Sequence, residues 1–477
     1  MAPFRRIARF TGVKAPMTVR ILDLVVPLAH KATAMCITET TGSLPEQSGA
    51  VSLLIGQNGL RQGDVDSTIG RSTQPIQIMP GTRISTTATR TTTTPTTSCL
   101  LAPSADETRH HPADLFIALV QAYYACRENK RNTESALDFE QHLERNLCNL
   151  YDELVEGTYR PGRSICFVVT RPKPREVWAA DFRDRIVHHL LYNHVAPRYY
   201  ASFIADSCAC IPGRGTLYAA KRLESKVRSI TQNWSKPAFY LKMDVANFFV
   251  SINKQVLYEL LAARITEPWW LGLTDTILFH DPRQNFEYRG RIDLLGLVPE
   301  HKRLTNQPSH LGLPIGNLSS QFFANVFLDV LDQFCKHKIG AKHYIRYVDD
   351  FVLLHESPQW LNDAKEQIEA FVIKRLGLRI NPTKTILQPI DRGIDFVGHV
   401  IKPWRTEPRK RTANAAMTRV MTVPTDSLFE TANSYFGLFR QATASHQQRC
   451  RLANHLRRRG HTINGAITKT YRRRNHA

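Results

Sequence analysis

The sequence predicts an α+β fold in which an antiparallel sheet is backed by helices. Helices are indicated where apolar residues recur at helical spacing, most clearly over 115–124 and 319–337. Strands are indicated by short apolar runs with polar borders, as over 239–245 and 344–355. Two adjacent aspartates split the last run into a hairpin. Because strands and helices each have an apolar side that must be covered, we expect the helices to pack against the sheet.

The expected elements follow in chain order. Leu115, Leu119 and Tyr123 share one face of a helix that begins near Pro112. A second helix is expected over 135–153, because its apolar residues keep the same spacing and a glycine and a proline follow it. The remaining elements are a strand over 167–169, a basic loop over 171–175, a helix over 183–195, a strand over 239–245, a helix over 319–337, a hairpin over 344–355, and basic helices from 405.

Composition divides the chain into three regions. Residues 1–108 show no sustained helical period and contain a threonine-rich stretch over 85–98. Such a segment cannot bury enough apolar surface to offset its ordering entropy, so we expect a disordered, low-complexity extension. The apolar patterns fill 109–404, and 405–477 is basic.

The charge of the chain indicates a polyanionic partner. The 477 residues include 63 Lys+Arg against 42 Asp+Glu, a formal net charge of +21. Nucleic acid is the first candidate, an anionic membrane surface is the second, and solubility alone is the third interpretation. No apolar run is long enough to cross a bilayer, and no membrane partner is expected.

Cysteine and histidine patterns give weak metal signals. The nine cysteines are scattered, and only Cys208 and Cys210 are close, without a second pair to complete a zinc site. His188, His189 and His194 also lack a completing pair. Free thiols favour a reducing, cytoplasmic location.

Three aspartates carry the strongest chemical signal. Asp349 and Asp350 stand at a turn between apolar runs, and alone they are typical of a solvated turn. Asp244 closes the apolar run 239–245, where an aspartate also serves as a helix cap. Together they suit two Mg²⁺ ions, which prefer hard oxygen ligands and stabilise both the attacking and the leaving oxygen of a phosphoryl transfer.

The segments that hold these aspartates resemble the palm motifs of reverse transcriptases. In order, they are 239–252, 312–332 with Gly-Leu-Pro-x-Gly-Asn, and 345–354 with Tyr-x-Asp-Asp. A hairpin over 394–399 resembles the primer grip of the same family. The similarity extends over 160–460.

The resemblance implies a fold and an activity. The fold is a right-hand polymerase with fingers and palm over 109–404, an antiparallel palm sheet backed by helices, and a helical thumb with a basic tail over 405–477. The activity is that of an RNA-directed DNA polymerase, which uses an RNA template, a DNA or RNA primer and dNTPs. Its cofactor is a pair of Mg²⁺ ions, with Mn²⁺ as the alternative.

The resemblance also implies roles for single residues. Asp244, Asp349, Asp350 and the backbone carbonyl of Val245 would bind the metal ions. Phe249 would be the steric gate that excludes a ribose 2′-hydroxyl, with ordinary core packing as the alternative explanation of a phenylalanine there.

Further binding residues are expected around these motifs. Those expected to bind the incoming dNTP are Arg175, Arg183, Phe249, Ile315, Gly316 and Lys384. Those expected to bind nucleic acid are Arg214, Gly215, Arg457, Arg458 and Arg459. Arginine offers bidentate contacts to phosphate, and contacts to the backbone are sequence-independent. For each basic residue, the alternative is a solvated surface charge.

Ile315 departs from the pattern of most reverse transcriptases, which carry Gln before Gly316. The change removes hydrogen-bonding capacity where the nascent base pair is held, so lowered fidelity is expected. This block, together with 433–438, resembles the reverse transcriptases of diversity-generating retroelements. Those enzymes copy an RNA with errors at adenines and work with a small basic helical accessory protein.

Two alternatives remain. One is another bacterial reverse transcriptase, of the antiphage defence, retron or group II intron type, although no endonuclease or zinc module is recognisable after the thumb. The other is a non-catalytic RNA-binding scaffold, against which the presence of all three aspartates argues. An RNA-dependent RNA polymerase is disfavoured because Phe249 would clash with a ribonucleotide.

Overall fold

A four-stranded antiparallel sheet carries the predicted aspartates, with the strand order β5-β6-β3-β7. Its strands are β3 (Phe239–Asp244), β5 (His343–Tyr347), β6 (Asp350–His355) and β7 (Ile386–Pro389). The predicted strand over 239–245 and the predicted hairpin over 344–355 are therefore confirmed.

The computed structural model describes residues 112–128, 133–171 and 173–471. These residues belong to a unit that begins at His110. The predictions made for 1–108 lie outside the described residues.

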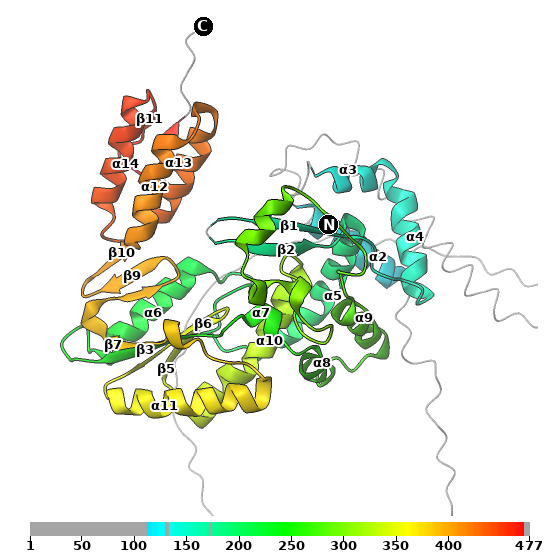
Figure 1. Cartoon of the computed structure of the whole chain (residues 1–477), viewed down its shortest axis with the longest axis horizontal. Coiled ribbons are helices and arrows are strands. Elements are labelled where there is room, and N and C mark those ends of the chain that lie inside the picture. Colours follow the sequence, from blue (N-terminus) through cyan, green and yellow to red (C-terminus); the bar gives the residue numbers. More distant parts are fainter. Residues whose placement is uncertain (1–111, 129–132, 172, 472–477) are drawn as a thin grey trace, which may run out of the picture. The chain divides into compact units, whose positions relative to one another are not determined.

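Helices cover both faces of the sheet (Figure 1). They are α6 (Thr216–Ile230), α10 (Leu318–Gln333) and α11 (Pro358–Phe371). Side chains alternate between the two faces of a strand. Leu241 and Phe351 join the core that contains α10 and α11, whereas Tyr240 and Val352 join the core that contains α6. The central strands therefore read as continuous apolar runs, which is why the sequence revealed them.

The N-terminal part of the described chain contains helices and a second, smaller sheet. The helices are α2 (Pro112–Arg127), α3 (Glu134–Gln141), α4 (Leu143–Val155) and α5 (Phe182–Tyr200). The sheet has the order β2-β1-β4 and consists of β1 (Ser164–Val169), β2 (Arg175–Ala179) and β4 (Phe286–Tyr288). Its β1–β4 pair is parallel, whereas its β1–β2 pair is antiparallel.

One N-terminal prediction is wrong. The single helix expected over 135–153 is two helices, because the backbone of His142 leaves the helical region with φ −129° and ψ 44°. The side-chain amide of Asn146 donates to the backbone carbonyl of Phe139 across this break. Apolar spacing continues through the break, so the pattern alone does not reveal it.

Further short elements surround the sheet. Between β3 and β5 lie α7 (Phe248–Ser251), α8 (Lys254–Ala262), α9 (Pro268–Phe279) and the 3₁₀ turns η2 (Ile292–Leu297), η3 (Glu300–Lys302) and η4 (Leu304–Asn306). The π-helical turns η5 (Phe334–Lys338) and η6 (Val372–Leu376) extend α10 and α11, and the 3₁₀ turns η7 (Pro382–Lys384) and η8 (Ile390–Arg392) flank β7.

The C-terminal part combines a three-stranded sheet, of order β10-β9-β8, with a helical bundle. Its elements are β8 (Ile394–Phe396), β9 (His399–Lys402), β10 (Arg405–Pro408), α12 (Lys410–Thr422), α13 (Thr425–Phe439), α14 (His446–Arg458), β11 (Thr462–Ile463) and β12 (Thr470–Tyr471). Helices were expected from 405. They begin instead at Lys410, because 405–408 pairs with β9 and alternates between exposed and buried side chains.

Within the described ranges, no helix combines the length and the apolar character that crossing a membrane requires. The seven described cysteines are free thiols. The cytoplasmic location stays a prediction.

Candidate active site

The sheet brings the three predicted aspartates together. Asp244 ends β3 and lies directly opposite Asp350, the first residue of β6. The N–H of Val245 donates to the carbonyl of Asp349 over 3.2 Å. Two strands that are about a hundred residues apart in sequence thus place their carboxylates at one edge of the sheet.

Burial and the charge of Asp244 raise the proton affinity of Asp349 and of Asp350. Burial, followed by the charges of Asp244 and Asp350, raises the pKa of Asp349 to about 6. Burial also raises the pKa of Asp350, and Lys242 opposes this shift. The Nζ atom of Lys242 lies 3.8 Å from Oδ1 of Asp350, and that of Lys384 donates to Oδ2 of Asp244 over 2.5 Å. The cluster therefore needs positive charge, which two lysines partly supply.

The donor set suits a hard divalent cation. Among residues 112–128, 133–171 and 173–471, no group of three or more histidine, cysteine, aspartate or glutamate side chains is arranged to enclose a metal ion. Mg²⁺ does not require such a cage, because it usually binds one or two carboxylates together with waters and substrate phosphates. Asp244 and Asp350 offer carboxylate oxygens at the edge of an open hollow, which fits that mode of binding.

This hollow, of 410 Å³, is rich in cations. It is lined by Lys173, Lys242, Asp244, Asp350, Lys384, Asp395, Arg409 and Arg411. Burial and the neighbouring charges of Lys384 and Arg411 lower the pKa of Lys173. Such crowding of positive charge suits a polyphosphate ligand.

The two arginines predicted to bind the dNTP do not line the hollow. Arg175 is exposed at the start of β2, whereas Lys173 of the same basic loop reaches the hollow. Arg183 on α5 forms ion pairs with Glu153 and Asp184. The guanidinium of Arg183 therefore binds two carboxylates of the N-terminal part of the described chain. These ion pairs give no support to the phosphate contact predicted for it.

A strained turn joins the strands that carry Asp349 and Asp350. Val348 has φ 55°, a left-handed conformation that costs a β-branched residue about 1–3 kcal/mol. The carbonyl of Val348 accepts a hydrogen bond from Nη1 of Arg346 over 3.1 Å. The guanidinium therefore holds the peptide that leads directly into Asp349.

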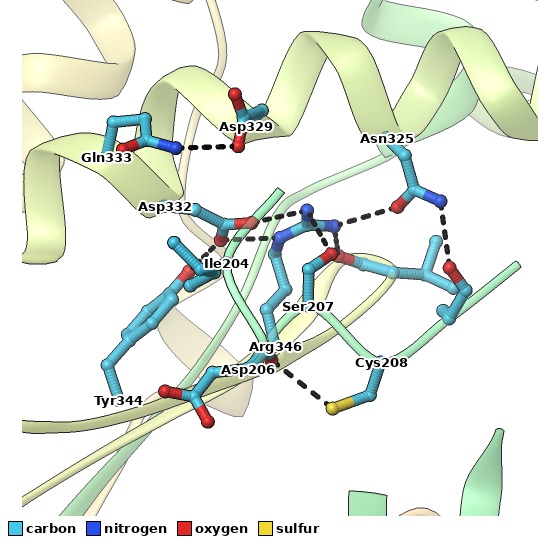
Figure 2. Close-up of polar contacts among 12 residues, drawn as sticks. Ile204, Asp206, Ser207, Cys208, Asn325, Asp329, Asp332, Gln333, Tyr344 and Arg346 are labelled. Atoms are coloured by element: carbon cyan, nitrogen blue, oxygen red, sulfur yellow. Dashed lines mark hydrogen bonds and ion pairs between the residues drawn. The ribbon is translucent and has the colours of Figure 1, made fainter. Parts of the chain in front are cut away.

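Arg346 is itself fixed by a buried polar network (Figure 2). Its side chain is 1% exposed, and its Nε and Nη2 atoms each donate over 2.7 Å to Asp332, which is fully buried on α10. The two remaining N–H groups donate to Asn325 and Ser207, so all five donors are used. Sequence reasoning missed this arginine, although a charged residue inside an apolar strand beside the Asp349–Asp350 pair was a signal.

The block that contains Ile315 docks on the smaller sheet. The N–H of Trp178 on β2 donates to the carbonyl of Ile315 over 2.7 Å, and the side chain of Asn317 accepts the N–H of Ala180. A Cβ atom at Gly316, where φ is 140°, would lie 2.4 Å from the carbonyl oxygen of Trp178. This close approach requires glycine.

Phe249 and Lys384 lie near the aspartates in the fold. Phe249 on α7 is half-buried beside Phe248 and packs against the main core, so its predicted steric role and ordinary packing are both consistent with its position. Lys384 ends η7 and contacts Asp244 directly.

Two residues predicted to bind nucleic acid instead hold the fold. Arg214 donates to the carbonyls of Ile204 and Ser207. Arg459 donates to the carbonyls of Val420 and Val423 at the end of α12. Their guanidinium groups satisfy buried or terminal carbonyls, which differs from the expected contacts to phosphate.

The other three predicted nucleic-acid residues have side-chain or backbone positions open to solvent. Arg457 and Arg458 are exposed on the last turn of α14. Gly215 is the N-terminal cap residue of α6, and nothing lies within 4 Å of a Cβ placed there. Their roles stay predictions.

Comparison with known proteins shows a family match over the residues that contain the three aspartates. The family described as "Reverse transcriptase (RNA-dependent DNA polymerase)" matches residues 172–401. Protein YkfC of Escherichia coli (strain K12) is 22% identical over 309 residues, which cover 58% of this chain and 74% of that protein.

Two further similarities are more distant. A putative COX1/OXI3 intron 2 protein of Saccharomyces cerevisiae is 20% identical over 311 residues, or 52% of this chain and 33% of that protein. The solved telomerase of Candida albicans, in complex with a fragment of telomeric RNA, aligns with a TM-score of 0.39 and 12% identity, covering 62% of this chain and 56% of that chain. This chain thus spans a third of the intron protein and about half of the telomerase chain.

The matched segment contains Asp244, Asp349 and Asp350, whereas Arg409 and Arg411 of the hollow lie beyond it. The sheet register and the cationic hollow agree with this match, and residues 172–401 are similar to the reverse transcriptase family.

Proposed function

We propose that this chain makes cDNA on an RNA template, and that Asp244, Asp349 and Asp350 are its catalytic residues. The observation that carries the proposal is the register of the sheet, in which Asp244 lies opposite Asp350 and Asp349 adjoins both. An isolated aspartate pair is common at turns. Carboxylates that come together from two strands beside a cationic hollow, with the pKa values of Asp349 and Asp350 raised, are typical of a functional site.

In this proposal the molecule has the parts of a right-hand polymerase. The β5-β6-β3-β7 sheet is the palm, and the β2-β1-β4 sheet with its helices belongs to the fingers, within 109–404. Helices α12, α13 and α14 form the thumb, within 405–477.

The aspartates and the carbonyl of Val245 would hold two Mg²⁺ ions, with Mn²⁺ as the alternative. When bound, such ions stabilise both the attacking and the leaving oxygen of an in-line displacement. Two backbone hydrogen bonds support this metal-binding role. The N–H of Val245 donates to the carbonyl of Asp349, and the N–H of Asn381 donates to the carbonyl of Asp244. These bonds fix the backbone at the site.

The cations of the hollow would bind and orient the incoming triphosphate. Lys173 approaches from the basic loop before β2, Lys384 from η7, and Arg411 from α12. Lys384 also contacts Asp244, so it stands where phosphate oxygens and carboxylate would meet. Phe249 would lie beneath the sugar and exclude a 2′-hydroxyl.

A primer-extension assay with purified chain, an RNA template, a primer and dNTPs tests this function. We expect Mg²⁺-dependent cDNA from the wild type and none from Asp349→Ala, while both proteins bind RNA with similar affinity. Absence of synthesis by folded wild-type protein, with RNA binding retained, would favour the scaffold instead.

We further propose that synthesis is error-prone and belongs to a diversity-generating retroelement, with a small basic helical accessory protein as partner. The support is Ile315, whose backbone is tied to Trp178 while its aliphatic side chain offers no hydrogen bond. Sequencing of cDNA should show excess errors opposite template adenine that fall in Ile315→Gln and persist in Ile315→Val. Errors spread equally over the four template bases would favour another bacterial reverse transcriptase.

A further inference from the structure

A second cationic hollow, of 510 Å³, lies between α6 and the beginning of β5. Its charged lining residues are Lys221, Arg222, Lys226 and Lys342, and no carboxylate is among the residues that line it. It shares no lining residue with the hollow beside the aspartates. The proposed catalytic function does not account for it.

Two of the lining cations, Arg222 and Lys226, are anchored on one buried carboxylate. Asp206 is 4% exposed and accepts hydrogen bonds from Lys226 over 2.9 Å and from Arg222, and Lys336 forms an ion pair with it over 2.9 Å. In Figure 2 the Asp206 carboxylate points away from the guanidinium of Arg346. Three cations therefore converge on a single negative charge, and their positions are set in advance of any ligand.

The titration behaviour of neighbouring groups agrees with uncompensated positive charge. Burial, followed by the charges of Lys226, Lys342 and Lys336, lowers the pKa of His343 to about 4. Burial lowers the pKa of Lys226, although Asp206 opposes the shift. With Lys221 and Lys342 exposed at the rim, five cations face one carboxylate.

The lining residues of α6 form two rows along the helix. Residues 218, 222 and 226 make one row, and residues 221, 225 and 229 make the other, with serines at the last two positions. Each row extends over eight residue-to-residue steps, or about 12 Å at about 1.5 Å per step. The rows therefore present cations and hydroxyls along a line, as an extended polyanion requires, and not at a single point.

We propose that this hollow binds the phosphate backbone of RNA outside the catalytic site. The inference rests on the proposed function, which brings RNA to the protein. Repeated cations and hydroxyls suit successive phosphates, to which Lys, Arg and Ser donate. An acidic protein partner would need apolar anchors at the centre of its interface, and Tyr218 is the one large apolar ring among the lining residues.

The test compares two double charge reversals in the full chain. Lys221→Glu/Lys342→Glu alters the hollow, and Lys374→Glu/Arg375→Glu on η6 makes the same change of net charge at exposed residues elsewhere. The affinity for a structured RNA of about sixty nucleotides is measured by fluorescence anisotropy over a series of salt concentrations. Thermal melting verifies that both variants fold.

We expect the hollow variant to bind this RNA at least about tenfold more weakly at low salt, and its log–log salt slope to fall by about two, since two phosphate contacts are lost. The control should change affinity less than about threefold. Equal losses in both variants, or unchanged binding by the hollow variant, would overturn the inference; the second result would leave an acidic protein as the occupant.

A second readout separates this inference from the proposed function. On a short primer–template that fills only the catalytic site, the hollow variant should make cDNA at the wild-type rate. If wild-type protein makes no cDNA while the hollow variant loses RNA affinity, the proposed function fails and the RNA-binding hollow stands.

Discussion

Replacing Arg346 by lysine tests whether its guanidinium fixes the turn at Val348 that leads into Asp349. The guanidinium and its partner Asp332 are 1% and 0% exposed, so water cannot replace a lost contact. Arg346→Lys keeps the positive charge beside Asp332, but a compact ammonium cannot span the distance to the Val348 carbonyl as the guanidinium fork does. Asp332→Asn would instead leave a buried charge unpaired, at a cost of about 3–5 kcal/mol in unfolding free energy.

The expected effect on activity follows from the bond to Val348. A hydrogen bond from a charged donor contributes about 1.5–3 kcal/mol, and without it the strained left-handed conformation of Val348 loses its support. If the whole amount appears in the barrier for nucleotide addition, kcat falls about 10- to 100-fold, at roughly 1.4 kcal/mol per tenfold change. The KM for dNTP should change little, because Arg346 does not line the hollow.

Tyr344→Phe is the matched control. It removes the hydroxyl that donates to Asp332 over 2.7 Å, from the same buried network, but leaves the bond to Val348 intact. Urea unfolding and single-nucleotide extension are measured for both variants. Tyr344→Phe should lose about 1 kcal/mol of stability with nearly full kcat. Full activity in Arg346→Lys, or an equal loss of kcat in both variants, would refute the positioning role.

Three further predictions concern other parts of the site. Gly316→Ala should destabilise the fold by about 2–4 kcal/mol in urea unfolding, because its Cβ meets the backbone oxygen of Trp178 in a strained conformation; a stable variant would contradict the close approach. Phe249→Ala should lower the preference for dNTP over rNTP, measured as the ratio of kcat/KM values, by at least about tenfold; an unchanged ratio would leave Phe249 as core packing. Arg459→Ala should cost about 1–2 kcal/mol of stability with RNA affinity retained, whereas Arg457→Ala should weaken RNA binding in a salt-dependent way.

The strands β3 and β6 and their aspartates were predictable because each apolar run has an aspartate at its end. β3 and β6 are apolar on both faces, so each stands out in the sequence, and Asp244 and Asp350 mark their ends. The family resemblance supplied the pairing, and the register confirms it. The break at His142 was not predictable, because apolar spacing continues across it.

The partners of arginine side chains were the main failure. A guanidinium reaches partners far away in sequence, and only the fold reveals whether it meets a ligand, a carboxylate or a carbonyl. Arg183 meets Glu153, Arg459 meets Val420, and neither contact has a local signal. For Arg346 a local signal existed, since burial of a charge inside an apolar strand requires a partner.

The basic loop before β2 shows a finer limit. Arg175 and Lys173 are two residues apart and equally basic, yet only Lys173 lines the catalytic hollow. Arg175 begins β2 and pairs with Val169 of β1, which leaves its side chain exposed. The sequence analysis placed both cations in one loop over 171–175 and did not predict the strand that begins at Arg175, so it could not choose between them.

Extension of a primer on an RNA template, with Mg²⁺ and the four dNTPs, tests the central claim most directly when wild type is compared with Asp244→Asn and Asp391→Asn. The two substitutions remove the same charge, but Asp391 is exposed on η8, away from the lining of the catalytic hollow. The account predicts full-length cDNA from wild type and Asp391→Asn, and a loss of at least about a thousandfold in rate for Asp244→Asn, comparable with the loss of one strong electrostatic contribution to catalysis. Near-normal synthesis by Asp244→Asn, or none by folded wild-type protein, would contradict it.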